Sequence, residues 1–265
     1  MISALDWRTL LSLAIGISIA AGLVLSVEEL FWMKRRKQLN KAALREMAVS
    51  LSTLPPNVVV SVFGASWWVL AYSAVSSLVP WRMHMNIGTL ALAILAADFC
   101  YYWEHRCAHR FHALWAAYHA VHHSSSAFTV ATAYRVSFVN QLIAPLFYMP
   151  CLLLGMEPLL VVGVQVLGIH YQAWVHTEMI GPLGWLDRVL NTPANHRVHH
   201  DAKLSRGVNL GGITILWDRL FGTYVPARRV TRYGIGDRES PKTVLSVYSQ
   251  PFDAPAIRSD DRAIT

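Results

Sequence analysis

Charged residues are scarce in this chain. They make up 15% of the 265 residues, while 54% are hydrophobic, and a soluble globular domain has about 25% charged residues. The chain therefore lacks the polar surface that a water-soluble protein of this length needs. It also lacks a module typical of nucleic-acid binding, and the net charge of +7 fits contact with anionic lipid headgroups. We expect a membrane and no nucleic acid among its partners.

Cysteine is scarce as well. Three residues, Cys100, Cys107 and Cys151, do not form a disulfide framework, so we expect free thiols. A Cys-rich ferredoxin segment, a flavin site and a cytochrome b5 domain are all missing from the sequence. If the protein carries out redox chemistry, we therefore expect its electrons to come from a separate donor protein or a small reductant.

Long apolar runs occupy much of the chain. Each has about 17 to 21 residues, close to the length that crosses a bilayer as a helix. The runs are Leu10–Val27, Val58–Leu78, Ile87–Trp103, Phe138–Leu154 and Pro158–Trp174. The alternative, buried helices of a soluble protein, leaves too little polar surface. The sequence predicts an all-α, polytopic, integral membrane protein with about four to five transmembrane helices.

Lys and Arg residues are distributed unevenly between the segments that join these runs. If the N-terminus lies outside, 21 of the 23 basic residues fall on one side, and only Arg8 and Arg82 fall on the other. Basic segments stay in the cytoplasm, so we expect this orientation. The bacterial inner membrane and the endoplasmic reticulum both fit, and we favour the bacterial membrane because the chain is compact and carries no retention motif.

Eight of the twelve histidines form three clusters. The clusters are His105 with His109; His119, His122 and His123; and His196, His199 and His200. On a helix, residues three and four apart share a face, so each cluster can direct two or three imidazoles at one point. Neutral imidazole binds iron, copper and zinc. Eight imidazoles are too many for one ion and about right for two, and the topology places them in a cytoplasmic helical cap.

The other histidines need separate consideration. His84 and His112 fit the ordinary interpretation of isolated structural residues. His176 leaves the last apolar run twenty residues before His196 and is a candidate ninth ligand. His170 lies six residues earlier, about 240° around a helix, so it joins the others only if the helix ends or bends between them.

The histidine clusters lie within longer motifs. The motifs are Asp98-Phe-Cys-Tyr-Tyr-Trp103-Glu-His105-Arg-Cys-Ala-His109, His119-Ala-Val-His122-His123-Ser-Ser, Asn191-Thr-Pro-Ala-Asn-His196-Arg-Val-His199-His200 and Trp217-Asp-Arg-Leu-Phe-Gly-Thr-Tyr224. In this combination the chain resembles the fatty acid hydroxylase / sterol desaturase superfamily. Thr132-Ala-Tyr-Arg135-Val-Ser and Trp174-Val-His176-Thr-Glu178 look like its alkylglycerol monooxygenase branch. Three features depart from that branch: Arg110 replaces an acidic residue, one extra residue separates His109 from His119, and Ser125-Ser-Ala-Phe-Thr is less polar.

The resemblance implies three segments. Residues 1–86 would be membrane anchor helices with a basic connector, residues 87–225 the catalytic domain, and residues 226–265 a polar, peripheral tail. It also implies two iron ions that activate dioxygen to oxidise a C–H bond of an ether lipid, sterol or fatty acyl lipid. Zinc is a rival ion, but it has no redox chemistry. We expect no catalytic side chain beyond the ligands.

Three polar residues close to the clusters are candidates for supporting the ligands: Asp98, Glu104 and Arg135. Asp98 lies one heptad before His105, on the same helix face, and can accept a hydrogen bond from a ligand N–H. The alternative is a local hydrogen bond to Tyr101, Tyr102 or an arginine. Hydroxylation and desaturation both remain open as reactions. So do two other classes of function, a membrane carrier of haem or metal and a non-catalytic lipid-binding protein.

Overall fold

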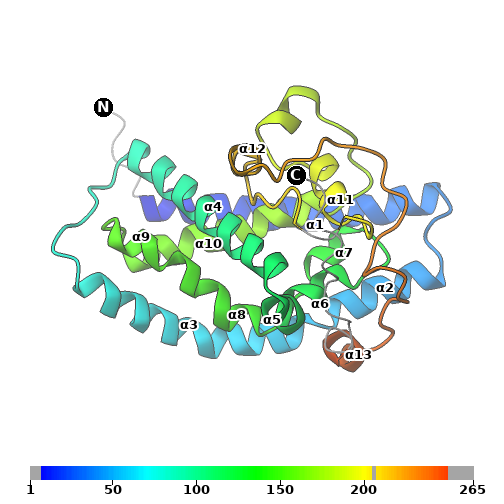
Figure 1. Cartoon of the computed structure of the whole chain (residues 1–265), viewed down its shortest axis with the longest axis horizontal. Coiled ribbons are helices and arrows are strands. Elements are labelled where there is room, and N and C mark those ends of the chain that lie inside the picture. The colour runs from blue at the N-terminus through cyan, green and yellow to red at the C-terminus, as the bar shows by residue number, and fades with distance from the viewer. Residues whose placement is uncertain (1–6, 205–206, 250–265) are drawn as a thin grey trace.

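The structure, a computed structural model, describes residues 7–204 and 207–249. Within these ranges the chain is helical and contains no strand, only two isolated bridges. This confirms the all-α prediction. Four long helices dominate Figure 1, and they are α1 (Trp7–Arg35), α3 (Leu54–Ser77), α4 (Ile87–Arg110) and α10 (Pro158–Val175).

Short helices make up the rest of the described chain. In order along the sequence they are α2 (Lys41–Leu51), α5 (His112–Leu114), η1 (Trp115–His119), α6 (Ala120–His123), α7 (Val130–Ala133), α8 (Asn140–Ile143), η2 (Ala144–Tyr148), α9 (Met149–Leu153), η3 (Gly184–Arg188), α11 (Pro193–His199), α12 (Leu216–Phe221) and α13 (Val244–Ser249). Figure 1 shows α6, α7 and α11 gathered beside the C-terminal half of α4.

Local sequence explains where the long helices begin. The Asn86 side chain accepts hydrogen bonds from the backbone N–H groups of Gly88 and Thr89, and the Thr89 hydroxyl accepts one from the Asn86 N–H, which completes a capping box at the start of α4. Prolines stand in the first turn of α3 and of α10, where a missing N–H costs no helical hydrogen bond.

A buried apolar cluster holds the long helices together. Its members come from α1, α3, α4, α9 and α10 and include Leu11, Tyr72, Ala93, Ala97, Leu152, Leu160 and Val164. Gly163 of α10 lets α1 approach closely, because a Cβ at this position would lie 2.2 Å from Leu11 Cδ2. The thiols of Cys100 and Cys151 meet inside the same cluster, with their Sγ atoms 3.6 Å apart. All three cysteines are free, as predicted.

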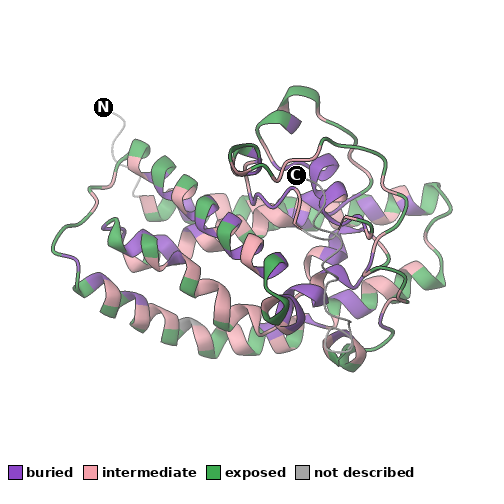
Figure 2. Ribbon diagram, viewed as in Figure 1, coloured by how far each residue is buried: buried purple, intermediate pink, exposed green. Residues whose placement is uncertain are grey.

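The outer faces of the long helices are apolar and exposed. Phe63 and Trp67 of α3 are 77% and 66% exposed, and Ile17 of α1 is 69% exposed. Figure 2 shows buried residues concentrated around α6, α7 and α11, while the long helices carry exposed and half-buried residues along their length. Apolar surface of this extent marks a lipid-facing protein.

Among the described residues, three helical segments are long and apolar enough to cross a membrane: Trp7–Arg35, Lys41–Gly64 and Pro158–Val175. The count is lower than the four to five predicted for two physical reasons. The run Phe138–Leu154 is divided into α8, the 3-10 helix η2 and α9, with Pro145 and Pro150 at the junctions. The run Ile87–Trp103 continues as α4, which is long enough to cross a bilayer but is less apolar than these three segments, because its second half carries Asp98, Glu104 and two histidines.

The segment after Pro226 is more than the peripheral tail that we expected. Val247 of α13 is buried against Val49 and Val121, and the Ser240 hydroxyl donates a hydrogen bond to Glu46 at 2.8 Å. These contacts tie residues 226–249 to α2 and α6. The remainder of the expected tail, residues 250–265, lies outside the described residues.

Candidate metal centre

Nine histidines lie in two adjacent groups. The first group contains His105, His109, His119, His123 and His199, and the second contains His122, His176, His196 and His200. Within each group the candidate ligand nitrogens all lie within 4.8 Å of one another. Eight of the nine side chains are buried, and His122 is partly exposed. The structure therefore brings together every histidine that the sequence proposed as a ligand, including His176.

The five-histidine group joins three parts of the chain. His105 and His109 project from α4, His119 ends η1, His123 ends α6, and His199 ends α11. The Nε2 atom of His119 lies 3.0 Å from that of His105 and 2.9 Å from that of His109. Ring contacts place His199 beside His105 and His109, with centroids 4.5 and 4.9 Å apart.

The four-histidine group forms around His176, the residue at which α10 ends. Its Nε2 atom lies 3.0 Å from that of His122 and 2.9 Å from that of His196. His200 completes the group from the end of α11, with its ring centroid 4.7 Å from that of His122.

Two of the three sequence clusters are divided between the groups, which the sequence analysis did not predict. His119 and His123 lie in the first group while His122 lies in the second. His196 and His200 lie in the second while His199 lies in the first. Helix geometry explains the division, because residues four apart differ by about 40° and adjacent residues by about 100°. The rings of His123 and His200 stack at 4.3 Å across the boundary, so the two groups are neighbours.

Main-chain carbonyls fix the orientation of several imidazoles. The Nδ1–H groups donate as follows: His105 to Leu210 O at 2.9 Å, His122 to Arg135 O at 3.3 Å, His176 to Gln172 O at 2.6 Å and His199 to Val208 O at 2.8 Å. A carbonyl only accepts, so in each of these rings Nδ1 carries the proton. The neutral ring then keeps a lone pair on Nε2, directed into the group.

This arrangement fits a cation in each group. The lone pairs of His122 and His176 face each other at 3.0 Å, and the Nε2 atoms of His199 and His200 are buried without a hydrogen-bond partner. Protonation of a ring does not relieve the repulsion between facing lone pairs, because burial lowers the pKa of His122 to about 4 and that of His199 to about 3. Adjacent ligands about 2.1 Å from an octahedral ion lie about 3.0 Å apart, which matches the observed spacing.

The two groups differ in the number of coordination positions that they would leave free on a bound ion. With one ion in each group, the five-histidine group would leave fewer coordination positions free than the four-histidine group. An ion with open positions can bind a small molecule such as dioxygen, whereas a closed structural site cannot. The described contacts of the two groups include no carboxylate ligand, so the arrangement is an all-imidazole one.

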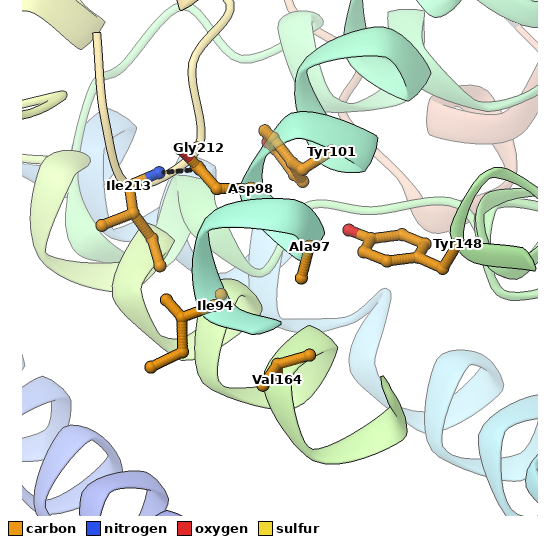
Figure 3. Close-up of a pocket in the computed structure, with 9 residues that line it drawn as sticks. Ile94, Ala97, Asp98, Tyr101, Tyr148, Val164, Gly212 and Ile213 are labelled. Atoms are coloured by element: carbon orange, nitrogen blue, oxygen red, sulfur yellow. Dashed lines mark hydrogen bonds between the residues drawn. The ribbon is translucent and has the colours of Figure 1, made fainter. Parts of the chain in front are cut away.

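Asp98 does not contact a histidine, in contrast to the prediction. Its carboxylate accepts hydrogen bonds from the backbone N–H groups of Ile213 and Thr214 at 2.6 and 3.1 Å. It also accepts from the Thr214 hydroxyl at 2.7 Å and the Trp217 indole at 2.9 Å. Figure 3 shows this carboxylate reaching from α4 to the Gly212–Ile213 backbone. Asp98 therefore anchors the segment whose Leu210 carbonyl orients His105, which is an indirect connection to the metal centre.

The Asp98 side chain also lines a small cavity between α4 and α10. The cavity measures about 10 Å³, room for about one water molecule, and its lining includes Tyr101, Tyr148 and Val164. The Tyr101 ring lies 5.4 Å from the His105 ring, centroid to centroid. Tyr101 thus lies between this cavity and the edge of the five-histidine group.

Glu104 and Arg135 lie beside the groups. Glu104 is buried and accepts a hydrogen bond from the Tyr118 hydroxyl at 2.7 Å. Tyr118 belongs to η1, a π-helical turn, and such turns are frequent at functional sites. Arg135 touches the centre through its main-chain carbonyl, which accepts from His122.

An aromatic pair that sequence reasoning missed covers the four-histidine group. The Phe128 ring lies 5.5 Å from His176 and 5.2 Å from His200, and the Tyr233 ring stacks on it at 4.9 Å. The sequence signal for this pair was an apolar residue, Phe128, within a serine-rich run. No local pattern links Phe128 to Tyr233, which lies far away in the sequence. His84, His112 and His170 belong to neither group.

Known proteins are similar to this chain in sequence. The chain is 42% identical over 157 residues to the alkylglycerol monooxygenase of Danio rerio, covering 59% of this chain and 34% of the relative. It is 40% identical over 144 residues to that of Homo sapiens, covering 54% and 32%. It is 30% identical over 175 residues to an ornithine lipid hydroxylase of Rhizobium tropici, covering 65% and 52%. The chain thus spans about a third of the length of the alkylglycerol monooxygenases.

No solved structure matches the chain significantly. The family comparison is decisive, because the sequence model of the fatty acid hydroxylase family matches residues 90–223, just over half of the chain, and this range contains all nine clustered histidines. The chain belongs to the fatty acid hydroxylase family.

Proposed function

We propose that this protein is a membrane-bound lipid hydroxylase that holds two iron ions, one in each histidine group. The observation that carries the proposal is the pair of adjacent, buried, all-imidazole groups whose Nε2 lone pairs converge at 2.9 to 3.0 Å. Bound iron would supply the activation of dioxygen. The overall reaction combines a lipid C–H bond, O2, two electrons and two protons, and yields a hydroxylated lipid and water.

The nine histidines are the proposed ligands. Main-chain carbonyls hold four of their rings in one tautomer, so a ring does not have to reorient when it binds an ion. Phe128 packs against His176, and Tyr233 stacks on Phe128, so the pair covers one side of the four-histidine group. Glu104 holds the π turn that carries His119, and Asp98 holds the segment that orients His105.

The substrate is proposed to be a lipid that enters from the bilayer. The relatives are named for alkylglycerols and for ornithine lipid, and an ether lipid is our first candidate, ahead of a sterol or a fatty acyl lipid. Exposed apolar faces on α1, α3 and α10 place the protein in lipid. The small cavity between α4 and α10 lies beside Tyr101, whose ring is 5.4 Å from that of His105, and we propose that the lipid approaches the five-histidine group from this side.

Electrons have to come from a donor protein or a small reductant, because the described chain holds no second redox group. We propose that the donor meets the protein on the cytoplasmic side, where the basic segments lie, of a bacterial inner membrane. The endoplasmic reticulum is the alternative location. Iron is preferred over zinc, since zinc has no redox chemistry.

Labelled dioxygen tests the proposal. Membranes containing the protein receive oxygen-18 gas, a reductant and an ether lipid, sterol or fatty acyl lipid, and lipid products are analysed by mass spectrometry. We expect label in the lipid, and loss of the label in His122→Ala. An unlabelled product that lacks two hydrogens would identify a desaturase. If iron-loaded protein consumes no oxygen with any lipid, the non-catalytic carrier or lipid-binding protein replaces the hydroxylase.

A further inference from the structure

Two glutamates that precede the family-matched residues 90–223 reach toward the four-histidine group. Glu29 lies on α1 and Glu46 on α2. We infer that Glu29 and Glu46 are positioning residues that hold His176 and His122 in place for the ion of this group. The inference rests on the proposed function, since it requires a metal ion in the four-histidine group.

Glu29 fixes the place where the chain leaves α10. It is 1% exposed, and its Oε1 atom accepts a hydrogen bond from the Thr177 hydroxyl at 2.5 Å. Thr177 directly follows His176, the C-cap residue of α10, and its carbonyl also accepts a hydrogen bond from the Arg197 guanidinium at 2.7 Å. A rigid Thr177 therefore limits how far the His176 ring can move.

The second oxygen of Glu29 holds another part of the same group. Oε2 accepts a hydrogen bond from the Val130 N–H at 2.8 Å, at the first residue of α7. Phe128, whose ring packs against His176, lies two residues earlier. One carboxylate thus ties both the His176 segment and the Phe128 segment to α1, and its two oxygens accept from two donors.

Glu46 acts on His122 through Arg135. Its Oε2 atom accepts hydrogen bonds from the Arg135 guanidinium at 3.0 Å and from the hydroxyls of Ser125 and Ser240 at 3.0 and 2.8 Å. The Arg135 side chain is 0% exposed, and its carbonyl accepts from His122 Nδ1. A buried guanidinium needs a paired carboxylate, so Glu46 fixes both the Arg135 side chain and, through its main chain, the His122 ring.

The hydrogen-bonded connections from Glu29 and from Glu46 lead to the same pair of histidines. His122 and His176 are the residues whose Nε2 atoms lie 3.0 Å apart, and each is held by a different glutamate. The five-histidine group receives no such support from α1 or α2 among the described contacts. Loss of either glutamate should therefore weaken one of the two metal sites and spare the other.

Metal titration of the full-length protein tests this selectivity. Purified protein is stripped of metal in detergent and titrated with Co²⁺, whose visible absorption reports the coordination of each ion. The variants are Glu29→Ala, Glu29→Gln and Glu46→Gln. The matched control is Glu28→Gln, because Glu28 is the neighbouring acidic residue on α1 and is exposed.

We expect wild type and Glu28→Gln to bind two ions. Glu29→Ala and Glu46→Gln should bind one ion normally and the other about tenfold more weakly, as expected for residues that act through a ligand. Glu29→Gln should recover part of the loss, because the amide oxygen still accepts from Val130.

The outcomes separate this inference from the proposed function. Wild-type protein that binds fewer than two ions would contradict the two-metal centre itself. Two ions bound with wild-type affinity by every glutamate variant would overturn the positioning role and leave the centre intact. Equal weakening of both sites, together with a lower unfolding temperature, would show a general structural role and would also overturn it.

Discussion

His122 and His176 lie 54 residues apart in the sequence, and their Nε2 atoms lie 3.0 Å apart in the structure. Each ring donates its Nδ1 proton to a main-chain carbonyl, so two lone pairs face one another. This contact joins the end of α10 to α6 and completes the four-histidine group. His176 is thus central to that group although it lies outside the three clustered motifs.

The first prediction concerns metal content. Replacing His176 with Ala removes the nitrogen that lies within 3.0 Å of both His122 and His196, so the four-histidine ion should be lost. Iron per chain should fall from about two ions to about one, since the five-histidine group keeps all its members. Inductively coupled plasma mass spectrometry on anaerobically purified protein measures the change.

His170→Ala is the matched control for this variant. His170 lies on the same helix and donates to the Val166 carbonyl at 2.8 Å, and it belongs to neither histidine group. Its variant should keep wild-type iron. Full iron retention in His176→Ala, or equal loss in both variants, would contradict the ligand role of His176.

Local spacing explains why the histidines could be predicted and their division could not. Residues such as His105 and His109 share a helix face whatever the tertiary fold. Helix geometry directs His199 away from His196 and His200, but which other histidines each of them meets depends on how α11 packs against α10, which is a tertiary property. The Leu210 carbonyl that orients His105 could not be predicted either, because a main-chain acceptor leaves no signal in the side-chain sequence. The sequence offers both Glu28 and Glu29 next to the apolar run Leu10–Val27, and only the fold distinguishes the buried Glu29 from the exposed Glu28.

The second prediction concerns Asp98. Asn at this position has only one acceptor oxygen, so its NH2 group would face backbone N–H donors of Ile213 or Thr214. Hydrogen bonds to a charged group contribute about 1.5–3 kcal/mol each, and Asp98→Asn should therefore lower the unfolding temperature by several degrees. It should also weaken the five-histidine site, because the anchored segment carries Leu210.

Thermal unfolding followed by tryptophan fluorescence measures this effect. Asp237→Asn is the control, since Asp237 is exposed and pairs with Arg232 at the surface. An unfolding temperature for Asp98→Asn equal to that of wild type would show that the carboxylate charge is not needed to anchor this segment.

The third prediction concerns acid. Burial lowers the pKa of His122 to about 4 and that of His199 to about 3, from an ordinary value of 6.5. At pH values between 6.5 and the lowered pKa, each of these histidines binds a proton in the unfolded chain but not in the folded chain. The free energy of unfolding therefore falls as pH decreases below about 6.5. The unfolding temperature of the metal-free protein should decrease steadily from pH 6.5 to 4.5. In His122→Leu the unfolding temperature should depend less steeply on pH. A constant unfolding temperature over this range would contradict neutral, buried imidazoles.

The predicted and observed spans differ for a reason that hydropathy does not capture. The run Phe138–Leu154 is apolar throughout, but Pro145 and Pro150 break its hydrogen bonding into three short helices. In α4 the apolar start and the ligand-bearing end form one continuous helix, so a single element passes from the apolar interior to the metal centre. Composition predicts the membrane protein, and the positions of Pro145 and Pro150 determine how the run Phe138–Leu154 is divided.

The last prediction concerns orientation. The loop between α3 and α4, which contains Met85, lies at the start of α4, and His105 and His109 lie at its end. At 1.5 Å per residue the 24-residue helix spans about 36 Å, which exceeds the hydrocarbon thickness of a bilayer. The loop and the metal centre should therefore face opposite sides of the membrane. Because the basic segments accompany the histidines, the metal centre should face the cytoplasm.

A reporter active only in the cytoplasm should work when fused after Thr265 and fail when inserted at Met85, while a reporter active only outside should show the reverse. If the Met85 insertion is active in the cytoplasm and the terminal fusion is silent, the orientation is inverted and electrons would have to reach the iron from the outer side.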